Sequence, residues 1–136
     1  MAGEEIARIP FKVKVEAVGT AEGEFIRFLA PRTVDALLRL LPLGGRVALY
    51  GEQVYFQVPL KMGLEKGVTT VAEGDVAYWP LGGALCLFKA AMQPHGSVSL
   101  VGKVTSGLDI FNKVRSGTPI KIDREEPSGQ AAMRAL

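Results

Sequence analysis

Gly74-Asp-Val-Ala-Tyr-Trp-Pro-Leu-Gly-Gly-Ala-Leu-Cys-Leu-Phe88 is the most informative part of this sequence for its architecture. Two apolar runs, residues 76–79 and 84–88, flank Pro80-Leu-Gly-Gly83, which is typical of a tight turn. The stretch therefore predicts a β-hairpin. Because residues 84–88 are all apolar, we expect both faces of this second strand to be buried.

Comparable strand patterns occur along most of the chain. Phe11, Val13 and Val15 alternate with charged residues, the period-two pattern of a strand with one buried face. A turn at residues 19–23 joins this strand to the next, so the first two strands are expected to form a hairpin. Other apolar runs between turns predict strands at residues 24–29, 46–50, 53–59, 68–71, 98–104 and 119–122. The pattern predicts about eight strands in all.

Two segments have the spacing of short helices instead. In residues 31–41 apolar side chains recur at helical intervals, and Pro31 suits the first turn, where its missing N–H is not needed. Residues 106–115 repeat the pattern, with Ser106 as the expected N-cap. Strands dominate and follow one another as hairpins. We therefore expect a mainly β fold, an antiparallel sheet closed or nearly closed into a barrel.

The length of 136 residues is that of one domain. We assign residues 1–122 to this domain and expect residues 123–136 to form a mobile tail. The chain contains one His, His95, and one Cys, Cys86. Neither a zinc site of Cys and His ligands nor a disulfide can be built from that pair within one chain. We expect no metal and no cofactor.

Charge and hydropathy argue against two classes of partner, nucleic acids and membranes. The 16 basic and 14 acidic residues are interspersed and give a net charge of +2, so we expect no nucleic-acid partner. No apolar run approaches the length of a membrane span, and the beginning of the chain is acidic, unlike a signal peptide. We therefore expect no membrane partner and a cytoplasmic protein. The single Asn, Asn112, is weakly typical of thermophilic proteins.

Two segments resemble cyclophilins. Residues 101–114, Val-Gly-Lys-Val-Thr-Ser-Gly-Leu-Asp-Ile-Phe-Asn-Lys-Val, are similar to the final cyclophilin strand and helix, and residues 28–35 are similar to the first helix. A closer resemblance is to a small family of cyclophilin-like proteins from archaea and bacteria with the motifs GExxYFxxP and GDVxYWPxGxALCLF. These match Gly51–Pro59 and Gly74–Phe88. The resemblance covers residues 9–122 and implies a closed eight-stranded antiparallel barrel with two short capping helices.

Cyclophilins catalyse prolyl cis/trans isomerisation, and this sequence matches their catalytic site only in part. Arg46 and Gln57 align with the Arg and Gln of the cyclophilin site, with three extra residues between them. The segment NGSQFF of the proline pocket is replaced by residues 82–88, and the segment that carries the site His is replaced by residues 95–102. We therefore assign no catalytic residue and expect no efficient isomerase activity.

The candidate ligand-binding residues are those with directed polar groups or aromatic rings near these strands. Tyr55 and Gln57 share one face of a strand with Gln53, either as a solvated polar face or as a ligand groove. Adjacent Tyr78 and Trp79 point to opposite faces, so one is expected in the core and the other partly exposed. Cys86 is expected to be a buried, inert thiol. The full candidate set is Arg46, Tyr55, Gln57, Tyr78, Trp79 and His95.

The sequence is compatible with three functions. The first is a non-catalytic barrel that binds a small molecule or an extended peptide in a groove between the hairpins of residues 46–57 and 78–88. The second is a weak prolyl isomerase that uses Arg46 and Gln57. The third is a structural module that forms a homo-oligomer, since a mean hydropathy of +0.20 is compatible with apolar surface hidden in an interface.

Overall fold

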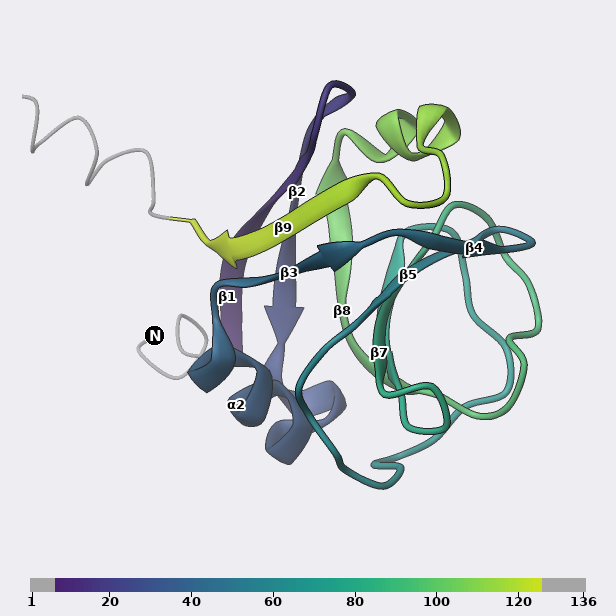
Figure 1. The fold of residues 1–136 in the computed structure, drawn as a ribbon. Coiled ribbons are helices and arrows are strands. Elements are labelled where there is room, and N and C mark those ends of the chain that lie inside the picture. The colour runs from purple at the N-terminus through teal and green to yellow at the C-terminus, as the bar shows by residue number, and fades with distance from the viewer. Residues whose placement is uncertain (1–6, 126–136) are drawn as a thin grey trace, which may run out of the picture.

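The computed structural model describes residues 7–125, and Figure 1 shows their fold. Nine strands form one sheet, in the order β3-β9-β1-β2-β8-β6-β7-β5-β4. All strand pairs are antiparallel. The strands are β1 (Arg8–Val15), β2 (Gly19–Ile26), β3 (Leu43–Arg46), β4 (Ala48–Tyr50), β5 (Gln53–Gln57), β6 (Asp75–Trp79), β7 (Ala84–Phe88), β8 (Ser99–Ser106) and β9 (Pro119–Arg124).

The segment from Leu43 to Tyr50 nearly closes this sheet into a barrel. Its first part, β3, pairs with β9, whereas its second part, β4, pairs with β5. Between them, the Val47 N–H donates to the Thr118 carbonyl at 2.9 Å. The mainly antiparallel barrel is confirmed, with nine strands rather than eight. The prediction of a strand at residues 68–71 was wrong, because only single bridges form there, from Val68 and Val71.

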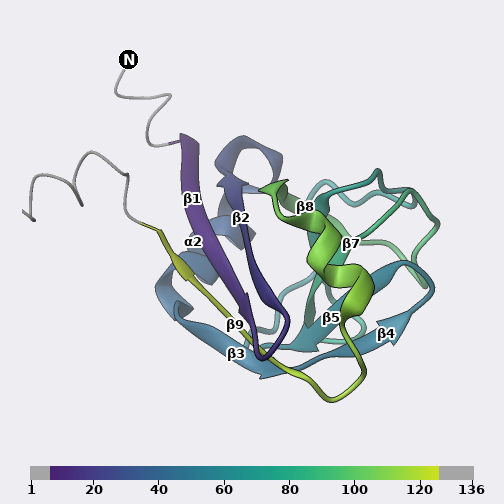
Figure 2. The ribbon, with the colours of Figure 1, turned by 90° about the horizontal axis from the view of Figure 1, so that it is seen from above.

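Two helices lie at opposite ends of the barrel, α2 (Pro31–Leu40) and the 3-10 helix η2 (Leu108–Lys113); a short 3-10 turn, η1 (Arg27–Leu29), precedes α2 (Figures 1 and 2). Pro31 occupies the first turn of α2, as predicted. The second predicted helix is shorter than residues 106–115, and Ser106 belongs to β8 rather than capping η2. Gly107 takes that place with a φ of +79°, and a Cβ there would lie 2.7 Å from the Thr20 carbonyl oxygen. Only glycine fits this close approach.

Apolar side chains fill two layers. The inner core lies inside the barrel and includes Phe11, Phe25, Phe56, Tyr78, Leu85 and Ile122. A smaller outer layer lies on the outward face of β5, β6 and β7, and consists of Val71, Ala77, Cys86, Phe88 and Val98 with the partly buried Tyr55, Val68, Trp79, Met92 and Leu100. All five residues of β7 are buried, which confirms the expectation that both faces of this strand are covered.

Strand β9 runs two residues beyond the expected end of the domain at residue 122. After it, the Glu125 N–H donates to the Pro10 carbonyl at 3.0 Å. Residues 126–136, most of the expected tail, lie outside the described residues, so the mobility of that tail stays a prediction. No helix within residues 7–125 combines the length and the apolar character needed to span a bilayer.

Candidate functional site

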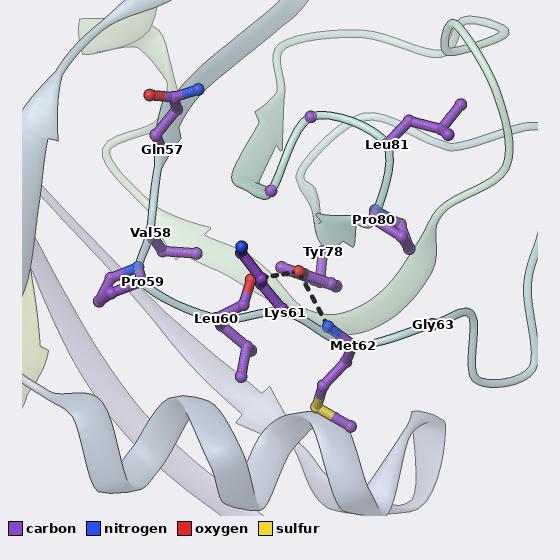
Figure 3. A pocket seen from close by; sticks show the side chains of 12 residues that line it. Gln57, Val58, Pro59, Leu60, Lys61, Met62, Gly63, Tyr78, Pro80 and Leu81 are labelled. Atoms are coloured by element: carbon purple, nitrogen blue, oxygen red, sulfur yellow. Dashed lines mark hydrogen bonds between the residues drawn. The ribbon is translucent and has the colours of Figure 1, made fainter.

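An open groove lies at the α2 end of the barrel, with a volume of about 990 Å³. One wall is the end of β5 with the loop that follows it, residues 57–63, and the other is the turn between β6 and β7, residues 80–83 (Figure 3). Tyr78 lies between the two walls. The groove is lined by Gln57, Val58, Pro59, Leu60, Lys61, Met62, Gly63, Tyr78, Pro80, Leu81, Gly82 and Gly83.

The loop wall is tied to the core by the Tyr78 hydroxyl. This fully buried side chain donates to the Leu60 carbonyl at 2.5 Å and accepts from the Met62 N–H at 3.4 Å (Figure 3). The Val58 N–H donates to the Gly83 carbonyl at 3.0 Å, which joins the two walls at one end. Because these bonds use groups of the protein itself, the groove is largely formed before any ligand arrives.

Glu65 holds the far end of the same loop. Its carboxylate accepts from the Thr33 N–H and Thr33 Oγ1, both at 2.8 Å, and from the Arg32 N–H at 3.1 Å. It thereby caps α2, whose own N-cap residue, Ala30, has no side-chain acceptor. The Glu65 N–H donates to Ser99 Oγ at 2.8 Å. Burial raises the pKa of Glu65, but the hydrogen bonds from Arg32 and Thr33 and the charge of Arg32 outweigh it, so the pKa lies below its ordinary value.

The turn wall depends on its two glycines. A Cβ on Gly82 would lie 2.3 Å from the Trp79 ring, and Gly83 has a φ of +57°, which favours glycine. The Gly83 N–H closes the turn on the Pro80 carbonyl at 3.2 Å. Leu81, at the tip, is 79% exposed, the most exposed large apolar side chain of the described residues. The turn thus presents an apolar side chain at the rim of the groove.

Of the six predicted site residues, the groove brings together Gln57 and Tyr78. Arg46 does not line it; its guanidinium donates to the Gly117 carbonyl at 2.9 Å. His95 is exposed and meets the ring of Tyr50 edge-on, with centroids 6.2 Å apart.

The other two predicted residues, Tyr55 and Trp79, belong to the outer layer. Their rings form an edge-to-face pair with centroids 5.5 Å apart. Tyr78 is fully buried and Trp79 is partly exposed, which confirms that these neighbours differ in burial. The prediction of a groove between the two hairpins was wrong, because β5 and β7 pair from Gln53 to Gln57; the groove lies beyond the end of β5, at Gln57.

Gln53 and Cys86 form a buried polar contact in the outer layer. The Gln53 amide donates to Cys86 Sγ at 3.4 Å, and its oxygen has no partner among the described residues. The polar pattern had allowed a solvated face at Gln53, which is 2% exposed. Burial raises the pKa of Cys86 far above its ordinary value, more than the Gln53 hydrogen bond lowers it. Cys86 is buried as predicted.

The lining residues that the sequence did not predict as site residues are 58–63 and 80–83, and the loop wall continues to Glu65 in residues 59–65. Residues 59–65 read Pro-Leu-Lys-Met-Gly-Leu-Glu, and beyond Pro59 their pattern predicts neither a strand nor a helix. Pro59 and Gly63 within it are residues typical of a turn. Nothing in the local pattern marked Glu65 as a cap, because its partners lie more than 30 residues away, in α2.

A smaller hollow of about 320 Å³ lies beside β1 and β9. Four basic and two acidic residues line it: Lys12, Lys14, Lys121, Arg124, Asp123 and Glu125. The two carboxylates offset two of the four positive charges, so this smaller hollow keeps a surplus of basic side chains. Across residues 7–125, no group of three or more His, Cys, Asp or Glu side chains is placed to hold a metal ion.

The family profile described as Cyclophilin-like matches residues 8–123. The chain belongs to the cyclophilin-like family. This cyclophilin-like barrel is similar to the solution structure of the hypothetical protein AF2241 from Archaeoglobus fulgidus, at 26% identity and a TM-score of 0.73, over 88% of this chain and 96% of that one. It also resembles the fold of McbB in complex with tryptophan, at 15% identity and a TM-score of 0.72, over 86% of this chain and 45% of McbB. No curated protein matches the sequence.

Proposed function

We propose that this cyclophilin-like protein binds a small organic molecule in the groove between residues 57–63 and 80–83. The observation that carries the proposal is the groove itself. Its volume of about 990 Å³ is at the upper end of the range for ligand sites, and its lining is mostly apolar with few polar side chains. The Gln57 amide offers both a donor and an acceptor to orient a ligand.

One structural neighbour, McbB, suggests which small molecules to test first. McbB was solved in complex with tryptophan, and its likeness to this chain concerns the fold. Aromatic amino acids therefore belong in a first ligand screen. An extended peptide is the other occupant that the sequence pattern allowed, and short peptides belong in the same screen as a competing outcome.

Prolyl isomerisation has less support. Gln57 lines the groove, but Arg46, its expected partner in catalysis, donates to the Gly117 carbonyl instead and does not line the groove. A protease-coupled assay on an Ala-Pro peptide tests this alternative. We expect the rate to equal the uncatalysed background. A rate above background that Arg46→Ala abolishes would favour the isomerase over our proposal.

A ligand screen by thermal shift tests the binding proposal, because a ligand that binds only the native state raises the Tm. Gly63→Trp provides an occluded groove: Gly63 lines the groove, and a Cβ there meets no atom within 4 Å. Lys113→Trp adds the same ring on η2, outside the groove.

We expect ligands that stabilise the wild type and Lys113→Trp to lose their effect on Gly63→Trp. Hits that stabilise all three proteins equally would place binding elsewhere and contradict the proposal. A broad metabolite library without a single hit on the wild type would contradict it as well.

We also propose a cytoplasmic location and self-association. Leu49 and Tyr50 on β4 are 41% and 50% exposed, which gives a second copy apolar surface to cover. Light scattering across a concentration series tests the self-association. A monomer at the highest concentration would rule it out, and cell fractionation tests the location.

A further inference from the structure

Lys61 is the one charged side chain among the twelve residues that line the groove. The remaining lining is neutral, and no carboxylate belongs to it. In Figure 3 the Lys61 side chain extends from the loop into the space between the two walls, on the same side as Val58 and Tyr78. The charge of this groove is therefore set by a single ammonium group.

The Lys61 ammonium has no partner among the described residues. No carboxylate in residues 7–125 lies within 4.0 Å of it. The neighbouring Lys66, in contrast, donates to the Phe28 carbonyl at 2.9 Å, and Lys89 lies 3.9 Å from the Glu52 carboxylate. Lys61 thus keeps all three of its donor hydrogens for solvent or for a ligand.

We infer that the ligand of the groove is an anion with an apolar body, a monocarboxylate attached to a hydrophobic or aromatic group. This inference rests on the proposed function and specifies its ligand class. The carboxylate pairs with Lys61, and the body lies against Val58 and Pro80, with Leu81 at the rim. A phosphate-rich ligand fits less well, because a single Lys supplies neither several charges nor the bidentate geometry of Arg.

Matched pairs of an acid and its amide test this inference, because the two members share an apolar body and differ in charge. Suitable probes are 3-phenylpropionate against 3-phenylpropionamide and indole-3-propionate against its amide. Amide chemical shifts in 15N-labelled protein report both the affinity and the place of binding. The proteins are the wild type, Lys61→Met and the matched control Lys113→Met, which removes one exposed charge outside the groove.

We expect each acid to bind the wild type and Lys113→Met about two- to fivefold more tightly than its amide, the range for an exposed ion pair. The preference should disappear in Lys61→Met and weaken as salt is added. The signals that move should be those of residues 57–63 and 80–83.

Two results would overturn the inference, and they differ in what they leave standing. If acids and amides shift the groove signals with equal affinity, the carboxylate assignment is wrong and the proposed function survives. If neither member of any pair shifts the groove signals of the wild type, the inference fails. A complete absence of hits in the separate metabolite screen then removes the proposed function too.

Discussion

Most of strand β5 is buried on both faces, its inward face by the inner core and its outward face by the outer layer. Its inward residues Val54 and Phe56 lie in the inner core, inside a ring of paired strands. Its outward residues Gln53 and Tyr55 lie beneath two loops that touch each other through the single bridges Val68–Val98 and Val71–Met92. The inner core is thus closed by a sheet, and the outer layer by a few loop contacts.

The outward face of β5 also changes along the strand. Gln53 is buried, Tyr55 is half-buried and Gln57 is exposed at the groove. The loops that form the outer layer therefore stop short of Gln57 and leave one end of this face open. The proposed ligand site occupies that end, and its loop wall is fastened to the core by Tyr78 and to α2 by Glu65.

The largest effect should come from truncating the inner core. Phe56→Ala removes a fully buried ring and should lower the free energy of unfolding by about 3–5 kcal/mol. Tyr55→Ala, one residue earlier and on the outer layer, removes a half-buried ring and its contact with Trp79, and should cost clearly less. Urea unfolding followed by circular dichroism measures both.

The Cys86 thiol provides an independent measure of the outer layer. It is buried and its pKa is raised by that burial, so a thiol reagent should react with it only when the layer opens. Tyr55→Ala should accelerate the labelling more than its loss of global stability explains. Equal costs for the two alanine variants, or labelling that follows global unfolding alone, would show that the two layers are one cooperative unit.

The strands and the barrel were predictable because their signals are local. The alternation of residues 11–15, the turn at Pro80-Leu-Gly-Gly83 and the apolar run of β7 each determine an element that the structure contains. The groove was predictable only in part. Gln57 and Tyr78 lie on predicted strands, so their faces follow from the period of two.

The remaining groove features depend on contacts between distant segments. Arg46 was expected to begin a strand, but it ends β3, and the pairing of β3 with β9 brings the Gly117 carbonyl within reach of its guanidinium. Gln53 looked like a surface residue because nothing nearby in the sequence shows that residues 68–71 and 92–98 fold over it. Long-range loop placement of this kind leaves no periodic signal in one sequence.

Removing the Tyr78 hydroxyl should have the next largest effect. Tyr78→Phe leaves the Leu60 carbonyl without its donor, which should cost about 1–3 kcal/mol. Tyr55→Phe is the matched control, since the Tyr55 hydroxyl has no hydrogen-bond partner among the described residues, and should change little. In Tyr78→Phe the amide signals of residues 60–63 should also exchange faster with solvent. Unchanged exchange there would mean that the groove loop is held by other contacts.

Glu65→Gln should destabilise the protein by about 1 kcal/mol, because it weakens the cap on α2. The pKa of Glu65 is lower in the fold than its ordinary value of 4.5, so its stabilising contribution is complete above that value. The contribution is lost as the pH falls through the lowered folded pKa. Unfolding measured at about pH 7 and about pH 3 should therefore show a difference between wild type and variant that shrinks in acid.

Glu52→Gln is the control for this experiment. Its exposed carboxylate lies 3.9 Å from Lys89, a distance that predicts little stabilisation at either pH. A constant difference between wild type and Glu65→Gln across the acid range would mean that the carboxylate charge has no part in anchoring the loop.

The smallest effect should come from His95→Ala, although His95 is the only histidine of the sequence. The side chain is exposed, lies outside the groove, and contacts Tyr50 only through a loose edge-on arrangement. The change in unfolding free energy should stay within about 0.5 kcal/mol. Ligand affinity, measured on the same protein, should equal that of the wild type. A weaker affinity would show that His95 takes part in ligand binding. The ligand site would then extend beyond the groove, toward the outer layer.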